Sequence, residues 1–308
     1  MSAPQILCLG EPLVEFNQTP EGLFAMGFGG DVSNVAIAAA RHGARAGMVT
    51  RVGTDPFGAA LCDLWAREGV DAAHVIRAAG EETGVYFVTH DAEGHHFTYR
   101  RKGSAASKLT PVNLPTDALS QAQVFYASGI GLAISDTMRA AVAEAAQITR
   151  AAGGLYAFDP NLRLALWSLE QARAVTHSAM QSADIALPGL DDARQLTGLQ
   201  TPEEIAAFYH DLGPSIVALT LGAEGVLISV KGEGLRLPGR KVEAKDATGA
   251  GDCFNGAFLA ALTTGHDPFQ AADLANMAAA LSTTGYGAVA PIPTLSQTRA
   301  ALNSAPRP

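Results

Sequence analysis

The stretch with the clearest chemical potential is KDATGAGDCFNGAF, residues 245–258, in which two glycines stand directly before a carboxylate. Apolar residues recur at helical spacing after Gly251, so a helix is expected to begin near Asp252. The free N–H groups of a helix start bind anions, and glycines let a phosphate approach the backbone. The segment Gly249-Ala250-Gly251 is therefore a candidate anion site.

Asp252 raises a question, because a carboxylate repels the anion that such a site would bind. It could simply cap the helix. It could also receive the proton of a hydroxyl that attacks a transferred phosphoryl group. An ordinary Asp has a pKa of about 3.9 and is ionised at neutral pH, so we expect no special tuning of the Asp252 pKa.

Other nucleotide-binding patterns are incomplete in this chain. Residues 234–241 imitate a P-loop, but Arg240 and Lys241 stand where the Lys and the Ser or Thr belong. Residues 27–32, GFGGDV, lack the third glycine of the dinucleotide fingerprint. The prediction of a phosphate site therefore depends on residues 249–251.

The segments around these motifs alternate between short apolar runs and Ala-rich stretches of helical spacing. Such alternation predicts an α/β fold with a mostly parallel central sheet flanked by helices. We expect the helix at 33–42 to be capped by Asp31 or Ser33 and to end at Gly43. The expected strands are 6–9, 48–52, 124–127, 155–158, 185–187, 216–221 and 226–230, and the other helices include 57–68, 136–151 and 169–180.

Two regions break this alternation. Residues 84–90 and 96–100 flank the turn signal Asp91-Ala92-Glu93-Gly94, which predicts a hairpin, and 11–16 with 22–28 could form a second strand pair. We expect about 11–30 and 83–103 to form a small β-sheet that acts as a lid on one domain, residues 1–308. Residues 291–308 are expected to be a loosely held tail.

Charge and composition limit the classes of partner that the protein can have. The chain has 308 residues and a net charge of −9, which argues against nucleic acid and anionic membranes. An anionic substrate would need a local Arg or Lys. Three separated cysteines, Cys8, Cys62 and Cys253, predict reduced thiols without a disulfide or zinc site. The absence of a signal sequence and of an apolar run of about 20 residues predicts a cytoplasmic protein.

Together, several motifs resemble the ribokinase-like (PfkB) carbohydrate kinases across essentially the whole chain. These motifs are DATGAGDCF (246–254), GGDVSN (29–34) and ALTLGAEG (218–225), which occur in the order and spacing of that family. The resemblance implies a ribokinase-like fold with a β-sheet lid, ATP and Mg²⁺ as cofactors, and association of copies through the lid into a homo-oligomer. A dependence on a monovalent cation stays open.

The details are most similar to 2-keto-3-deoxygluconate kinases, through FTYRRKGSAAS (97–107), FDPNLRLALW (158–167), GEPLVEF (10–16) and TGVYFV (83–88). The resemblance implies Asp252 as catalytic base and Gly249, Ala250 and Gly251 as the anion hole. Around the sugar it implies Gly30, Asn34, Tyr86, Tyr99, Arg101, Arg163 and Asp252. Around ATP it implies Thr220, Gly222, Gly225, Gly249, Gly251 and Asn276.

The chain departs from the family pattern at two places. PGLDDA (188–193) replaces a usual Asn-x-x-Glu segment linked to Mg²⁺, which leaves Asp192 as a ligand through water and Gly189 without a side chain. Arg100 stands where close relatives often carry an aromatic residue. The sequence thus favours a kinase of 2-keto-3-deoxygluconate. A fructokinase or other neutral-sugar kinase is the alternative, and a nonenzymatic sugar sensor is a third.

Overall fold

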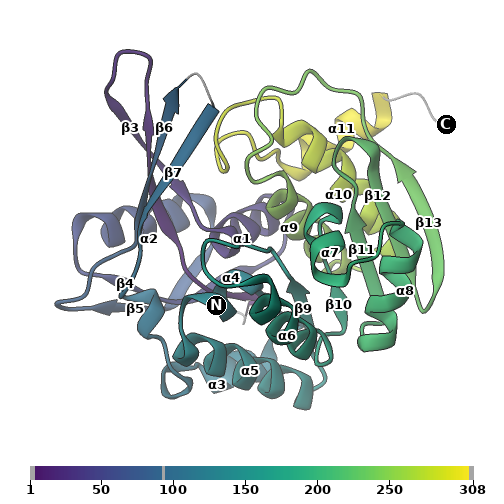
Figure 1. The fold of residues 1–308 in the computed structure, drawn as a ribbon, viewed down its shortest axis with the longest axis horizontal. Helices are drawn as coiled ribbons and strands as arrows, with labels where there is room; N and C mark the ends of the chain where they lie inside the picture. The colour runs from purple at the N-terminus through teal and green to yellow at the C-terminus, as the bar shows by residue number, and fades with distance from the viewer. Residues whose placement is uncertain (1–3, 92–93, 305–308) are drawn as a thin grey trace.

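A nine-stranded sheet forms the centre of the computed structural model, which describes residues 4–91 and 94–304 (Figure 1). Its strand order is β13-β12-β11-β10-β9-β8-β1-β4-β5. Neighbours from β11 to β5 pair in parallel, whereas β12 runs antiparallel to both β11 and β13. The strands are β1 (Ile6–Leu9), β4 (Ala46–Gly53), β5 (Asp71–Ala78), β8 (Val124–Ser128), β9 (Leu155–Asp159), β10 (Ile185–Ala186), β11 (Ile216–Thr220), β12 (Gly225–Val230) and β13 (Glu233–Pro238).

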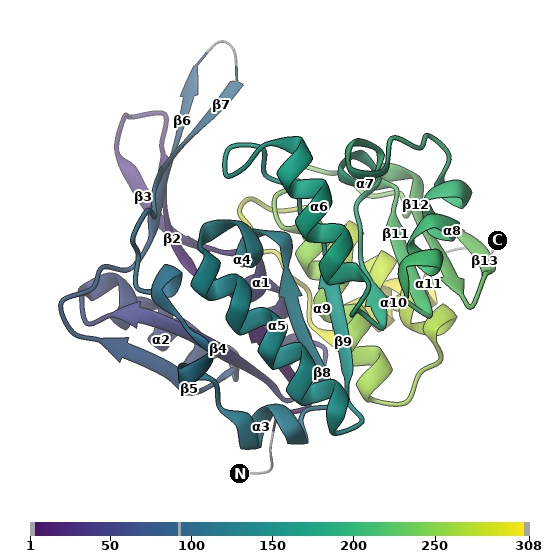
Figure 2. The same cartoon turned by 60° about the horizontal axis from the view of Figure 1, so that its bottom comes forward.

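Helices cover both faces of this sheet (Figure 2). Strand β1 shows why, because Ile6 and Cys8 belong to one buried cluster while Leu7 and Leu9 belong to the other. The first cluster includes α1 (Asp31–Arg41), α2 (Pro56–Glu68), α9 (Ala250–Thr263) and α10 (Pro268–Ser282). The second includes α3 (Thr116–Gln121), α4 (Gly129–Ile134), α5 (Asp136–Ala151), α6 (Leu169–Met180), α7 (Leu190–Thr197) and α8 (Pro202–Leu212). Short 3₁₀ turns are η1 (Ala106–Lys108), η2 (Pro111–Asn113) and η3 (Gly222–Glu224).

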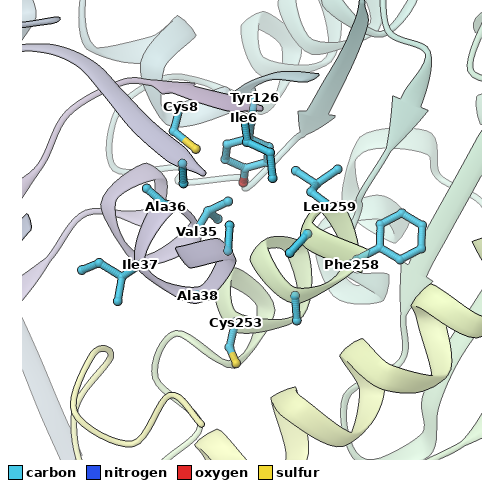
Figure 3. Close-up of a cluster of buried hydrophobic side chains, with 14 of the residues drawn as sticks. Ile6, Cys8, Val35, Ala36, Ile37, Ala38, Tyr126, Cys253, Phe258 and Leu259 are labelled. Carbon is cyan, nitrogen blue, oxygen red and sulfur yellow. The ribbon is translucent and has the colours of Figure 1, made fainter. Parts of the chain in front are cut away.

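Helices α1 and α9 pack tightly against each other, and this contact positions the site (Figure 3). Gly256 permits the approach, because a Cβ there would lie 2.4 Å from the carbonyl oxygen of Val35. Ala38 lies at the same contact, because that added Cβ would also lie 2.6 Å from the Cβ of Ala38. The start of α9 is thereby held beside the first turns of α1.

A four-stranded sheet projects from this body in both ribbon views (Figures 1 and 2). Its order is β3-β2-β6-β7, with two antiparallel hairpins joined by the parallel pair β2–β6. All four strands lie within the two ranges that broke the sequence alternation. Ala92 and Glu93 of the expected hairpin turn lie outside the described residues. The strands are β2 (Leu13–Gln18), β3 (Phe24–Gly29), β6 (Val85–Asp91) and β7 (Gly94–Arg100).

Three local expectations were wrong. The N-cap of α1 is Gly30, at a φ of 93°, rather than Asp31 or Ser33. The segment expected to be a loose tail contains α11 (Leu295–Ser304), whose Thr298 is buried with Oγ1 at 3.1 Å from Nε2 of His42. Strands β5 and β13 were missed, and β13 occupies the stretch that imitates a P-loop.

Candidate active site

Asp252 lies in the first turn of α9 and is held by a side chain of α1. Nδ2 of Asn34 donates a hydrogen bond of 2.8 Å to Oδ2 of Asp252. The N-cap of α9 is Gly249, at a φ of 74°, so the alternative of Asp252 as a simple helix cap is wrong. Oδ1 of Asn34 is buried and has no hydrogen-bond partner among the described residues. That oxygen can therefore accept a hydrogen bond from a hydroxyl group of a ligand bound next to Asp252.

The start of α9 leaves two backbone donors free. Ala250 N–H bonds to the carbonyl of Ala247, and Cys253 N–H bonds to that of Gly249. Between them, the N–H groups of Gly251 and Asp252 have no acceptor within 4–91 and 94–304. A Cβ on Gly251 would meet nothing within 4 Å, so open space borders the helix start at this residue. Two free amides at a glycine-bordered helix start fit a phosphate group.

The loop before α9 is fixed by Asp246. Its Oδ1 accepts hydrogen bonds from the N–H and the hydroxyl of Thr248, and its Oδ2 accepts one from the N–H of Gly287. Gly249 fits closely in this loop, because an added Cβ would lie 2.9 Å from Cβ of Ala288. Gly249 is thus required by the backbone conformation, whereas Gly251 borders open space.

A network of buried carboxylates and amides surrounds Asp252. Asn161 follows β9 at a φ of 33°. Its Nδ2 donates to Oδ2 of Asp31 at 2.9 Å, and its backbone N–H donates to Oδ1 of Asp159 at 2.9 Å. Nδ2 of Asn255 donates to Oδ2 of Asp159 at 2.8 Å. The network links α1, α9 and the carboxyl end of β9 at one edge of the sheet, where open α/β folds bind ligands.

The pKa of Asp252 is raised to about 7. Burial is the largest cause and the Asp31 carboxylate is the second, while the hydrogen bond from Asn34 and the charge of Arg163 oppose them. This corrects the sequence expectation of an ordinary pKa, which took no account of Asp31. Burial also raises the pKa of Asp159 well above its usual value.

The lid residues form a stacked series. The rings of Tyr86 and Tyr99 stack with centroids 5.5 Å apart, and the guanidinium of Arg101 lies 5.5 Å from the Tyr99 ring centre. The Tyr86 hydroxyl donates to the buried Glu15. Arg101 is paired with Glu11, whose side chain is fully buried and also accepts a hydrogen bond from Ser104. Two predicted sugar-binding residues are therefore already engaged by carboxylates.

Two other predicted sugar-binding residues, Gly30 and Arg163, have different surroundings: Gly30 is closely packed and Arg163 is half exposed. A Cβ on Gly30 would lie 2.6 Å from the carbonyl oxygen of Glu11, so a glycine is required there. Arg163 is half exposed, and its Nη1 lies 4.0 Å from Oδ2 of Asp192. That oxygen accepts a hydrogen bond from the N–H of Leu162, and burial raises the pKa of Asp192. Among the described residues, no group of three or more His, Cys, Asp or Glu side chains could hold a metal ion.

The predicted nucleotide residues lie on and beside the β11–β12 hairpin. Thr220 ends β11 and bridges to Gly189, while Gly222 and Gly225 take positive φ values of 61° and 104°. Asn276 lies inside α10, where its Nδ2 donates to the carbonyl of Pro238 at 2.8 Å. The structure thus places these residues around one end of the sheet, but it connects them to Asp252 by no direct contact.

Sequence reasoning missed the carboxylates Glu11, Glu15, Asp31 and Asp159 and the amides Asn161 and Asn255. A signal existed for some of them, because Glu11 and Glu15 are acidic residues in an otherwise apolar stretch. A groove of about 990 Å³ lies elsewhere, along α5 and α6, and none of the predicted site residues lines it. The candidate site is therefore defined by the polar contacts around Asp252 and not by this groove.

Comparison with known proteins decides the family. A model of the pfkB family of carbohydrate kinases matches residues 4–295. The chain belongs to this family. Among the pfkB kinases, the chain is 35% identical to a 2-dehydro-3-deoxygluconokinase of Thermoproteus tenax, over 90% of this chain and 87% of the relative. It is 34% identical to fructokinase-1 of rice, Oryza sativa subsp. japonica, over 94% of both chains.

A solved pfkB-type structure has the same ribokinase-like fold. It is a fructokinase double mutant from Vibrio cholerae, with fructose, ADP and a potassium ion bound. The TM-score is 0.88 at 29% identity, covering 97% of this chain and 99% of the other. The family and these relatives make the protein a carbohydrate kinase, so the third alternative, a nonenzymatic sugar sensor, is wrong. Within the described ranges, no helix is long and apolar enough to cross a membrane.

Proposed function

We propose that this kinase transfers the γ-phosphoryl group of ATP to the terminal hydroxyl of 2-keto-3-deoxygluconate, giving the 6-phosphate. The observation that carries the proposal is the hydrogen bond between Asn34 and Asp252 beside two free amides at the start of α9. Asp252 takes the hydroxyl proton as the oxygen attacks the γ-phosphorus, and the bond from that phosphorus to the β–γ bridging oxygen breaks, so that ADP leaves. The amides of Gly251 and Asp252 then stabilise negative charge on the phosphoryl oxygens.

A pKa near 7 suits Asp252 for this role. A general base is most effective when its pKa lies near the operating pH, because it is then both substantially ionised and basic enough to accept a proton. The bond from Asn34 keeps one oxygen of Asp252 occupied, which leaves the other to meet the hydroxyl. The free Oδ1 of Asn34 supplies an acceptor for a second sugar hydroxyl.

Arg163 supports a sugar acid as the substrate. Its guanidinium is half exposed. Nη1 donates to the Leu162 carbonyl at 2.8 Å and lies 4.0 Å from Oδ2 of Asp192, so Nε and Nη2 are the pair that can form two parallel hydrogen bonds with a carboxylate. A chain of net charge −9 needs such a local cation to bind an anion. Tyr86, Tyr99 and Gly30 would line the remaining surface of the sugar.

A neutral sugar such as fructose is the second candidate, and one contact favours it. Arg101, the other cation expected at the sugar, is already paired with the buried Glu11. Arg163 would then be alone in recognising a carboxylate. The 34% identity to a fructokinase is also close to the 35% identity to a 2-dehydro-3-deoxygluconokinase.

Mg²⁺ is the metal that the residues fit. Mg²⁺ usually keeps several waters and binds one or two carboxylates together with substrate phosphates. A site with the single carboxylate of Asp192 is therefore sufficient for Mg²⁺, although the described residues contain no group of three acidic or other metal-binding side chains. Asp192 would hold it through water, because Oδ2 already accepts the Leu162 N–H and Gly189 has no side chain. When bound, Mg²⁺ neutralises the charge of the phosphates. The β11–β12 turns at Gly222 and Gly225, with Thr220 and Asn276, would surround the nucleotide.

A second copy of the chain would cover the lid. Leu23, Phe24 and Met26 are large apolar residues that stay exposed on β3 and the turn before it, with Leu23 70% exposed, whereas Phe97 lies on the other face of the small sheet. Such clusters on a monomer mark interaction sites. We therefore include a homo-oligomer formed through the lid in the proposal.

A substrate panel tests the assignment. Purified enzyme with MgATP is assayed for ADP release with 2-keto-3-deoxygluconate, fructose, ribose and an amino sugar. The proposal expects the highest kcat/KM for 2-keto-3-deoxygluconate. A higher kcat/KM for fructose would transfer the assignment to the second candidate.

A further inference from the structure

Asp31 is a buried carboxylate near the proposed base, and no ion pair between described residues includes it. Its neighbours hold it at that place. Oδ2 accepts a hydrogen bond from Nδ2 of Asn161, and Asn161 is fixed in turn by its backbone bond to Asp159. A buried charge without a cation is costly, so its presence calls for a reason.

The helix geometry places Asp31 on the side of α1 that contacts Asp252. Asp31 and Asn34 are three residues apart in α1, and residues at this spacing lie on the same side of a helix. Asn34 contacts Asp252 directly, so Asp31 lies one turn from that contact. Asp31 is also the first residue of α1 but not its cap, since the N-cap is Gly30 and no side chain caps the helix. Its carboxylate thus does not cap the helix.

We infer that Asp31 is a positioning residue that sets the proton affinity of Asp252 through its negative charge. This inference rests on the proposed function, in which Asp252 is the base. With Asp31 beside it, Asp252 holds a proton more strongly than an ordinary Asp, and it accepts the proton of a sugar hydroxyl more readily. Asn34 acts in the opposite direction, because its hydrogen bond stabilises the ionised form of Asp252.

Other groups near Asp252 are compatible with this assignment. Arg163, on the loop after β9, is the neighbouring cation and favours the ionised form of Asp252. Asp159 on β9 is hydrogen-bonded on both oxygens. Burial raises the pKa values of three further neighbours, Tyr86 on β6, Tyr126 on β8 and Cys253 on α9, and the charge of Asp252 raises them further. These three side chains therefore stay neutral in the pH range of the experiment. Asp31 is therefore the neighbouring carboxylate whose removal should change Asp252 most.

The experiment follows the Asp252 carboxyl directly, without substrate. Enzyme carrying ¹³C in its Asp carboxyl groups is titrated by NMR from pH 5 to 9, and the Asp252 signal is assigned by its loss in Asp252→Asn. Asp31→Asn retains an oxygen that can accept the Asn161 hydrogen bond while removing the charge. It should lower the Asp252 midpoint by about one pH unit or more. Asn34→Ala should raise it.

The opposite signs separate electrostatic tuning from damage to the fold, which would not move the two variants in opposite directions. Asp136→Asn is the matched control, because it removes one negative charge from an exposed position in α5 and should leave the midpoint unchanged. If Asp31→Asn does not fold, Asp31→Ser provides the same loss of charge. An Asp252 midpoint that stays unchanged or rises without the Asp31 charge would overturn the inference.

This titration does not depend on the assignment of the base. If Asp252→Asn kept full activity, the proposed function would fail while the NMR midpoints could still shift as expected. If Asp252→Asn lost activity and the Asp31 variants did not move the midpoint, only the present inference would fail. A second readout is the acid limb of kcat/KM, which should move to lower pH in Asp31→Asn.

Discussion

Asn34 and Asp252 are 218 positions apart in the chain, and Nδ2 of the first lies 2.8 Å from Oδ2 of the second. The packing of α1 on α9 brings them together, with Gly256 allowing close approach. The residue proposed to bind the sugar thereby also fixes the residue proposed to activate it. A shift of either helix would change both functions at once.

The raised pKa of Asp252 predicts an unusual pH dependence for an aspartate base. The base must be ionised, so activity should approach its full value about one pH unit above 7, be half of that value near pH 7, and fall further at lower pH. At one unit below the pKa, about a tenth of the enzyme has the ionised carboxylate. The measurement is kcat/KM for the sugar from pH 5.5 to 9 at saturating MgATP. A rate that stays level down to pH 5 would mean an ordinary Asp.

The two glycines of the GAG segment should respond differently to an added methyl group. Gly249→Ala forces a residue with a Cβ into a φ of 74° and against Ala288, so the free energy of unfolding should fall by roughly 1–3 kcal/mol. Gly251→Ala meets no protein atom within 4 Å, so its Tm should be unchanged or slightly higher.

Gly251→Ala should lose activity although its stability is kept. Its methyl group would occupy the open space that borders the free amides, so kcat/KM for ATP should fall on the order of tenfold or more despite normal stability. Thermal unfolding and steady-state kinetics on the same preparations provide the comparison. A fully active Gly251→Ala enzyme would show that phosphate binds elsewhere.

The sequence predicted the central sheet and the position of the lid strands well, because their signals are local. Alternating strands and helices, the Gly-rich turn before α9 and the hairpin around 91–94 can be seen in short windows. The missed strand β13 is largely exposed and lacks the apolar run that identified the buried strands. The tail was missed because the burial of Thr298 depends on a contact with His42, far away in the chain.

The site was predictable only in part for the same reason. Motifs predicted Asp252, Asn34 and Arg163 as site residues, each from its own segment. The carboxylate network was missed, because the neighbours of Asp31 come from elements far apart in the sequence: Asn161 follows β9 and Asp252 lies in α9. Pairing of Arg101 with Glu11 likewise requires the end of β7 to meet the end of β1. The Asp31 contact raises the pKa of Asp252, and the Glu11 contact neutralises the charge of Arg101. Neither effect can be predicted from a single motif.

Arg163 should distinguish an acid sugar from a neutral one. A hydrogen bond to a charged group contributes about 1.5–3 kcal/mol, so Arg163→Ala should raise KM for 2-keto-3-deoxygluconate by roughly 10–150-fold. The effect on fructose should be smaller, because fructose has no carboxylate. Arg163→Lys should restore only part of the affinity, since Lys lacks the planar pair of donors. Equal losses on both sugars would argue for a neutral substrate.

The exposed apolar residues of the lid predict association in solution. Leu23→Asp combined with Phe24→Asp should convert an oligomer into monomers, because two charges would be placed at the proposed contact. Val112→Asp is the control, as Val112 is 93% exposed but lies in η2, outside the lid. Sedimentation velocity at matched concentrations measures the result. If wild-type enzyme is a monomer at micromolar concentration, association through the lid is excluded.

The most direct test of the account is the turnover of Asp252→Asn. The substitution keeps the size of the side chain and an oxygen for the Asn34 hydrogen bond, but it removes the base. We expect kcat to fall by roughly 10²–10⁴ while the Kd for ATP, measured by calorimetry, changes little. A variant that phosphorylates its sugar at the wild-type rate would contradict the assignment of Asp252 as the general base.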